Sequence, residues 1–113
     1  MDSAGQLDHE LRWTPSEKKA ARRAYDKAFE LQCAAITKEV KRMLQKMSNP
    51  GDIWRIEEYL YEKRKEVDRL FQFSYSRLIL VFSILMRDGW MTDADLAGLD
   101  QEKIDRIKRF PRY

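Results

Sequence analysis

The first long run of regularly spaced apolar positions follows a helix-start motif. Thr14, Pro15 and Glu17 provide a capping hydroxyl, a proline at the first helical position and a carboxylate at the third, which together satisfy backbone donors at a helix N-terminus. Segment 48–52 contains a proline and a glycine, which end a helix. The intervening positions step by three and four and predict one helix reaching Met47 with a single buried face: Ala21, Tyr25, Ala28, Gln32, Ile36, Val40, Met43 and Met47.

A second apolar row predicts a helix over residues 53–70 that packs back against the first. Asn49 or Asp52 can cap it. At about 33 residues, the first helix would be roughly 50 Å long, too long for the second to cover its apolar face. Two-fold pairing buries such a stripe against its own copy, so we predict a homodimer. The row has the spacing of a packed helical seam and consists of Ile53, Ile56, Leu60, Lys63, Val67 and Leu70.

The last third of the chain predicts a compact helical head. Residues 78–86 are apolar on nearly every face, which predicts a buried helix starting at Ser74 or Ser76 and ending at Asp88-Gly89. Thr92 opens a short helix that closes at Gly98. A last amphipathic helix is predicted with a cap, three inward residues and a proline stop, namely Asp100, then Ile104, Ile107 and Phe110, then Pro111.

Taken together, these elements predict an all-α fold with a long two-helix antiparallel stalk that dimerises and a small helical head. The stalk spans about residues 14–73 and the head about 74–110, in one domain over 13–113, after a disordered tail over 1–12. Composition agrees, since 36% charged residues with only 4 Gly and 3 Pro among 113 residues is typical of solvated helices.

The sequence lacks the residue groupings of the common catalytic and metal sites. Cys33 is the only cysteine and is expected to be a buried, inert side chain; His9 is the only histidine and lies in the predicted tail. Glycine-rich phosphate loops and metal-binding motifs are absent. We therefore expect no enzymatic activity and no cofactor or metal. The chain has neither a signal-like N-terminus nor an apolar run of about 20 residues, which predicts a cytoplasmic protein without membrane insertion.

The basic C-terminal segment is a weak candidate for binding nucleic acid. It could also be a basic helix end that complements its own dipole. The formal charge of the whole chain is only +3, so we expect no nucleic-acid partner. The basic residues are Lys103, Arg106, Lys108, Arg109 and Arg112.

One stripe of the second helix combines aromatic and charged residues. Glu57, Tyr61, Arg64 and Asp68 follow one another by four, three and four positions, with Trp54 just before them. The stripe can be a solvated face on which Arg64 pairs with Asp68. It can equally be a docking surface, because Trp, Tyr and Arg most often dominate binding energy.

From Trp13 onward the sequence resembles the fluorescence recovery protein family of cyanobacteria. The resemblance covers nearly everything after the tail, and its order and spacing hold without gaps from Asp52 on. The residues that carry it are Trp13-Thr14 with Glu17-Lys18, Asp52-Ile53-Trp54-Arg55-Ile56, Leu60, Lys63-Arg64, Val67-Asp68, Tyr75-Ser76, Leu78-Ile79, Val81-Phe82, Asp88-Gly89-Trp90, Leu96-Ala97-Gly98-Leu99 and Glu102-Lys103-Ile104.

This resemblance implies a non-enzymatic regulator of photoprotection. Family members dimerise, bind the photoactivated orange carotenoid protein largely on its C-terminal domain, speed its return from red to orange, and promote its release from the phycobilisome. It implies a cytoplasmic protein, either free or peripheral at the cytoplasmic side of thylakoids. The alternative is a divergent dimeric adaptor of the same fold with another partner, because several surface positions depart from the family pattern.

The resemblance also implies a set of partner-binding residues. The family's functional tryptophan and arginine fall on Trp54 and Arg64, and an acidic position, usually Asp, is Glu58. A position that is usually His is Glu57, and Lys63 precedes the arginine. In the head, an aromatic position is Leu80 and a C-terminal lysine is Arg106.

Overall fold

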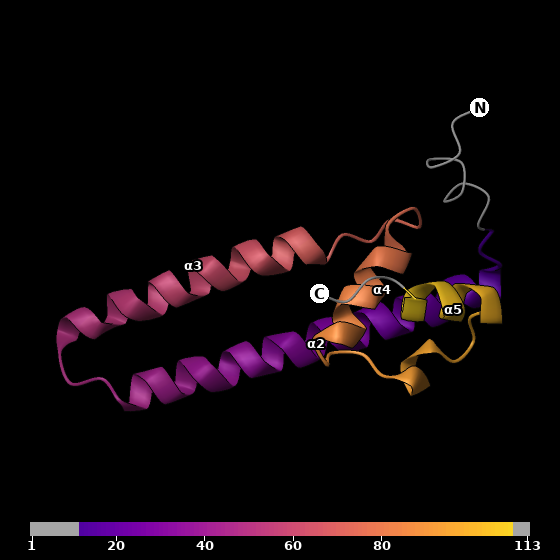
Figure 1. The fold of residues 1–113 in the computed structure, drawn as a ribbon. Coiled ribbons are helices and arrows are strands. Elements are labelled where there is room, and N and C mark those ends of the chain that lie inside the picture. Colours follow the sequence, from indigo (N-terminus) through magenta and orange to yellow (C-terminus); the bar gives the residue numbers. More distant parts are fainter. Residues whose placement is uncertain (1–11, 110–113) are drawn as a thin grey trace.

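The computed structural model describes residues 12–109, and that range is helical without any strand (Figure 1). Its α-helices are α2 (Pro15–Gln45), α3 (Ile53–Leu70), α4 (Leu78–Arg87) and α5 (Gln101–Arg109). Two short 3₁₀ segments, η1 (Pro50–Asp52) and η2 (Asp93–Leu96), lie between them. The predicted all-α class is confirmed. The predicted tail, apart from Arg12, and the inward position of Phe110 lie outside the described residues.

The start of α2 is the predicted capping box. The Glu17 N–H donates to Thr14 Oγ1 at 3.1 Å, and the Thr14 N–H donates to Glu17 Oε1 at 3.0 Å. The helix ends at Gln45, two residues before the predicted Met47, and the Lys46 N–H closes its last turn. The hydrogen bonds between Thr14 and Glu17 therefore fix the start of α2 at the predicted residue.

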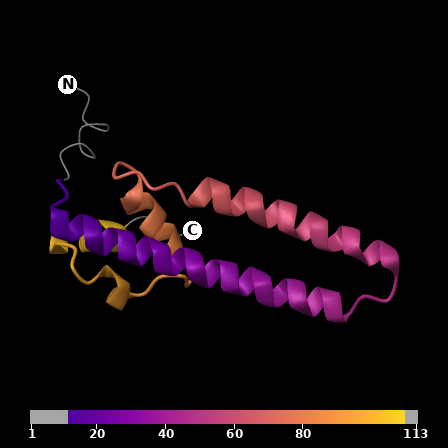
Figure 2. The same cartoon turned by 180° about the vertical axis from the view of Figure 1, so that it is seen from behind.

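The turn after α2 is organised by one carboxylate. Asp52 accepts hydrogen bonds from the backbone N–H groups of Ser48 at 3.0 Å and Asn49 at 3.1 Å. These two bonds hold the pKa of Asp52 below its ordinary value. Asp52 thus fastens the turn and makes no side-chain hydrogen bond to the first turn of α3. From this turn, α3 returns beside the C-terminal half of α2 as the predicted antiparallel hairpin (Figures 1 and 2).

The head begins later than predicted. The first residue of α4 is Leu78, and its N-cap position is occupied by Arg77 without a side-chain hydrogen bond. The predicted start at Ser74 or Ser76 is wrong, because these two hydroxyl groups hydrogen-bond each other at 3.0 Å in the connecting turn. The end of α4 is as predicted, with Gly89 at φ 85°. The short helix predicted after Thr92 is the 3₁₀ segment η2.

The head packs on the N-terminal half of α2 and forms the main core with it. Four alanines of α2 are buried there, Ala20, Ala21, Ala24 and Ala28, and their small side chains allow close approach. Gly98 lies so close that a Cβ added to it would be 2.7 Å from the Ala20 Cβ. The head contributes Leu78, Val81, Phe82, Leu85, Leu96 and Ile107, all 0–1% exposed.

This packing changes the interpretation of the long apolar stripe. The head of the same chain covers its first half, which the sequence argument assigned to a second copy. In the second half, Ile36, Val40, Met43 and Met47 are only half-buried. The part of the apolar stripe of α2 that is left for another molecule therefore lies in the stalk, beyond the head.

Candidate functional site

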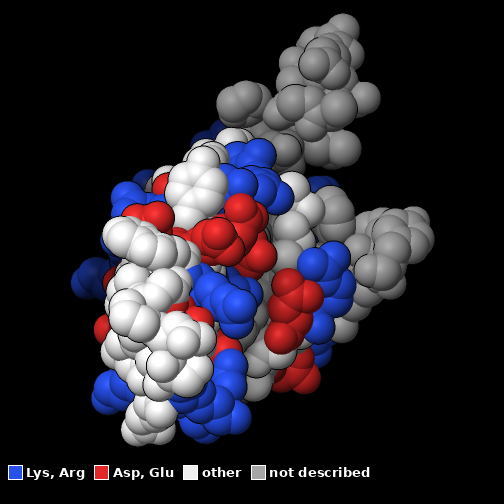
Figure 3. Space-filling view, turned by 90° about the vertical axis from the view of Figure 1, so that its left-hand side faces the viewer, with Lys and Arg blue, Asp and Glu red and all other residues white. Residues whose placement is uncertain are grey.

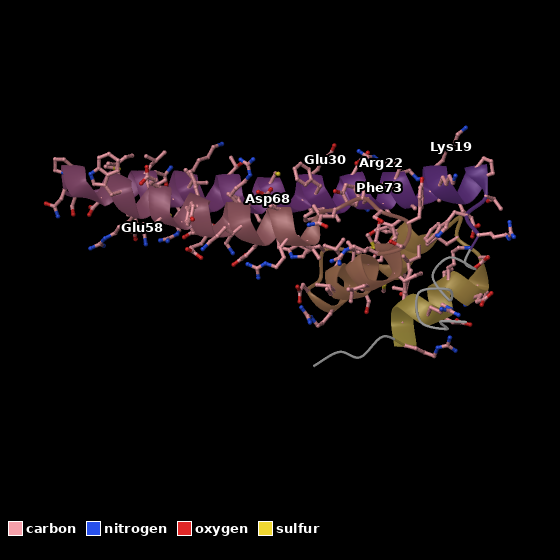
Figure 4. All side chains as sticks on the ribbon, turned by 90° about the horizontal axis from the view of Figure 1, so that it is seen from above. Lys19, Arg22, Glu30, Glu58, Asp68 and Phe73 are labelled. Atoms are coloured by element: carbon pink, nitrogen blue, oxygen red, sulfur yellow. The ribbon has the colours of Figure 1, made fainter. Side chains whose placement is uncertain are left out.

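Helix α3 exposes the row of side chains singled out from the sequence. Trp54 and Tyr61 are each 63% exposed, and the Arg64 side chain is 78% exposed. Only Ile56 of α3 is buried, since the helix has a single neighbour, α2, along the stalk. The row is therefore available to a partner along the length of α3. Figure 4 shows Glu58 and Asp68 toward opposite ends of this helix.

The predicted ion pair on this row is present. Arg64 Nε donates to the Asp68 carboxylate at 3.1 and 3.2 Å. Such an exposed pair contributes little to stability. It does orient the guanidinium, whose two Nη groups have no protein acceptor among residues 12–109. The Arg64 guanidinium is thus oriented by one weak ion pair, and its planar Nη groups are free to donate to a carboxylate or carbonyl of a partner.

A cleft of about 700 Å³ lies between the two stalk helices. On the α2 side it is lined by Phe29, Cys33 and Ile36. Cys33, expected from the sequence to be buried, is half-exposed in this wall. The cleft therefore has an apolar wall and a charged rim. The α3 side consists of Glu57, Leu60, Tyr61, Lys63, Arg64, Val67 and Asp68.

The candidate residues occupy three places. Glu57, Lys63 and Arg64 line the cleft. Trp54 and Glu58 are exposed on the same helix but are not among the lining residues. In the head, Leu80 is half-buried on α4, and the Arg106 side chain on α5 is 29% exposed, 3.9 Å from Glu102. Five candidates thus share α3, and the two head candidates lie apart from them.

Viewed from the tip of the stalk, uncharged side chains gather on one side of the near end (Figure 3). Acidic and basic side chains intermingle beside them. Three large apolar side chains of α2 that were not singled out from the sequence are also exposed. The signal was available, because Phe29, Leu31 and Leu44, which are 40–48% exposed, fall outside the regular core stripe of α2.

A buried ionic cluster joins the two ends of the described chain. Lys103 is 2% exposed and Glu17 is 5% exposed, and the Lys103 Nζ lies 3.1 Å from Glu17 Oε2. The same Nζ donates to the Arg12 carbonyl at 2.6 Å and to Asp100 at 3.1 Å. It also lies 5.1 Å from the centre of the Trp13 ring. Lys103 is therefore removed from the basic surface to which the sequence assigned it.

This cluster governs the ionisation of Glu17. Burial by itself raises the pKa of Glu17, but N–H donors of Thr14 and Asp100 and the Lys103 ammonium outweigh it. The pKa of Glu17 consequently lies below its ordinary value of 4.5. The carboxylate is held ionised inside the fold, where it links the start of α2 to the start of α5.

Two further features bear on the kind of chemistry available. Among residues 12–109, no group of three or more His, Cys, Asp or Glu side chains is arranged to hold a metal ion. In the same range, every helix is too short or too polar to cross a bilayer.

Residues 13–110 match the family described as the photoprotection regulator fluorescence recovery protein. The chain belongs to this family. The fluorescence recovery protein of Synechocystis sp. strain PCC 6803 is 25% identical over 103 residues, which are 91% of this chain and 94% of that protein. The match spans both stalk and head, so the resemblance seen in the sequence is confirmed.

Solved structures of family members have the same fold. The fluorescence recovery protein of Fremyella diplosiphon superposes with a TM-score of 0.80 at 35% identity, covering 86% of this chain and 95% of that chain. The structure from Synechocystis sp. PCC 6803 gives a TM-score of 0.80 at 25% identity, with the same coverage. This protein is thus a member of a family of photoprotection regulators and has the family's helical fold.

Proposed function

We propose that this protein binds the photoactivated form of the orange carotenoid protein and accelerates its return from the red to the orange form. In doing so it promotes release of that protein from the phycobilisome. The observation that carries the proposal is the exposed row on α3, in which Trp54 and Arg64 occupy the positions that the family resemblance assigns to partner contact. Both side chains are more than 60% exposed, and they belong to residue types that dominate binding energy.

The proposed action is differential binding, without covalent chemistry. A regulator speeds a conformational change only if it binds the closing transition state, or a compact intermediate, better than the open form. A long rigid stalk that contacts two separated domains would raise their effective concentration and favour closure. Trp54, Glu58 and Arg64 would contribute the main contact, Glu57 and Lys63 its charged border, and Leu80 and Arg106 a second contact from the head.

The proposed functional form is a homodimer. The cleft between α2 and α3 has an apolar wall, and the apolar residues in the second half of α2 are only half-buried. A second copy would bury both against its own equivalents. The dimer would leave the charged rim of each cleft at the edge of the interface, within reach of the carotenoid-binding partner.

We expect sedimentation to show a dimer at micromolar concentrations. Leu60→Asp should shift the protein to a monomer, because the new carboxylate would have to be desolvated in the apolar cleft. Leu31→Asp is the matched control, since Leu31 is similarly exposed, at 44%, but does not line the cleft. A wild-type monomer at these concentrations, or equal dissociation by both variants, would contradict the proposed interface.

The regulatory activity is tested by following dark recovery of photoconverted orange carotenoid protein. We expect wild-type protein to accelerate recovery. Arg64→Leu or Trp54→Ala should reduce this acceleration about tenfold or more, as expected for interface residues of this type. Arg55→Leu removes the same charge from an exposed position on another face of α3 and should retain activity.

Two results would count against this assignment. Unchanged recovery at excess wild-type protein would reject the orange carotenoid protein as partner and favour a divergent adaptor of the same fold. Loss of the folded state in Arg64→Leu or Trp54→Ala, measured by circular dichroism, would identify these residues as structural.

A further inference from the structure

A second cleft, of about 500 Å³, lies where the end of α3 meets α4. It shares only Lys63 with the cleft between α2 and α3. Its apolar part is formed by Leu70, Val81, Ile84 and Trp90. None of the proposed contact residues except Lys63 lies here, so the proposed function leaves this cleft unexplained.

The charges around this cleft are unevenly paired. Four basic and two acidic residues line it, and each acid is already engaged: Glu66 lies 3.3 Å from Lys63, and Asp88 lies 2.9 Å from Arg87. The other two basic residues, Arg69 and Arg77, form no ion pair within residues 12–109. The cleft therefore has two exposed guanidinium groups beside an apolar floor.

A buried polar atom in the wall points to a hydrogen-bonding ligand. Gln32 is only 8% exposed and lines the cleft, and its Oε1 has no hydrogen-bond partner among residues 12–109. Leaving a buried acceptor without a donor is unfavourable. Because Oε1 is enclosed, a bound group can donate to it only when the amide turns toward the cleft. Gln32 then offers an acceptor for an N–H or O–H donor at the inner side of the cleft.

We propose that this cleft binds an acidic peptide segment of a partner protein. A carboxylate of the segment would pair with Arg69 and Arg77, which suit planar recognition of carboxylates. A neighbouring apolar side chain would lie on the floor near Ile84 and Trp90, which are half-buried, and a backbone N–H of the peptide would donate to Gln32. The combination of two unpaired guanidiniums, an apolar floor and an unsatisfied carbonyl fits a peptide better than a free anion.

The probe is the capped peptide acetyl-Ala-Leu-Asp-Leu-Ala-amide, titrated into the ¹⁵N-labelled full-length protein. We expect chemical-shift changes at the Gln32 side-chain amide and the Trp90 indole. The double variant Arg69→Gln/Arg77→Gln should weaken binding about tenfold. A peptide with Asn in place of Asp should bind similarly weakly to wild type.

The matched control is Arg22→Gln/Arg23→Gln, which removes the same charge from exposed positions on α2 and should bind the probe like wild type. Equal weakening by both double variants would overturn the proposal by reducing the interaction to net charge. Absence of shifts at Gln32 and Trp90 would also overturn it. So would a changed sedimentation profile in Arg69→Gln/Arg77→Gln, because the cleft would then belong to an interface between copies. All three outcomes are independent of the recovery assay.

Discussion

Replacing Lys103 with methionine is expected to lower the free energy of unfolding by about 3–5 kcal/mol, the usual cost of removing one member of a buried ion pair. Methionine has a similar length but cannot donate to Glu17, Asp100 or the Arg12 carbonyl, all of which the Lys103 Nζ contacts within 3.1 Å. Glu17 would remain buried and ionised without its ammonium partner. The measurement is urea unfolding followed by circular dichroism.

Lys108→Met is the matched control on the same helix. The Lys108 side chain is 43% exposed and pairs with Asp93 at 3.2 Å, so its loss should cost less than about 1 kcal/mol. The double variant Glu17→Gln/Lys103→Met should lose less stability than Lys103→Met alone, because the uncompensated charge is gone. Similar losses in Lys103→Met and Lys108→Met would show that burial does not set the strength of this pair.

The Lys103–Glu17 cluster also predicts that the free energy of unfolding depends on pH, which apolar packing alone would not produce. The pKa of Glu17 is lowered in the folded state, so ionised Glu17 contributes fully above its unfolded value, near 4.5, and progressively less as pH falls through the lowered folded value. Wild-type stability should therefore fall as pH drops below about 4.5. In Lys103→Met this fall should be shallower, because one cause of the lowered pKa is missing.

Phe82→Ala is expected to destabilise the protein by about 3–5 kcal/mol, a loss large enough to threaten folding of a single domain. Phe82 is 0% exposed and is the largest fully buried side chain among residues 12–109, in a core shared by α2, α4 and α5. Truncation removes apolar burial and leaves a cavity that surrounding helices can fill only in part. The thermal midpoint should drop by more than about 10 °C.

Leu80→Ala provides the comparison on the same helix. Leu80 is half-buried on α4, so solvent can occupy the vacated space and the expected loss is about 1 kcal/mol. A loss in Leu80→Ala as large as that in Phe82→Ala would mean that α4 depends equally on both of its faces. That result would contradict a core built on the fully buried side chains of α4.

Helix boundaries illustrate how far the sequence alone can go. The start of α2 was predictable because the Thr14–Glu17 capping box closes within four residues. Although the bonds that Asp52 accepts from Ser48 and Asn49 are a finding of the structure, the turn after α2 was predictable from Pro50 and Gly51. The start of α4 was not, because the hydroxyls of Ser74 and Ser76 bond each other and leave the helix to begin on packing of Leu78, which is 0% exposed. A competing local hydrogen bond thus occupies both hydroxyls that could have capped the helix.

The candidate site was likewise predictable only in part. Spacing on one helix placed Trp54, Glu57 and Arg64 on neighbouring faces of α3, and the family resemblance added Glu58. The structure leaves all four exposed there. Their sequence could not indicate that Phe29 and Ile36 of α2 would form the opposite wall of a cleft. Nor could it place Gln32, a polar residue in an apolar stripe, beside α4.

By itself, the sequence determined the all-α class, the hairpin, the capped start of α2 and the family, because each depends on periodicity, on motifs or on contacts a few residues apart. Only the tertiary structure decided that the head covers the first half of α2 and that Lys103 lies buried against Glu17, 86 positions away in the chain. From the sequence, Lys103 was predicted to be one of several basic residues on the surface. Its burial depends on the docking of α5 onto α2, where long-range packing and charge pairing compensate the loss of water.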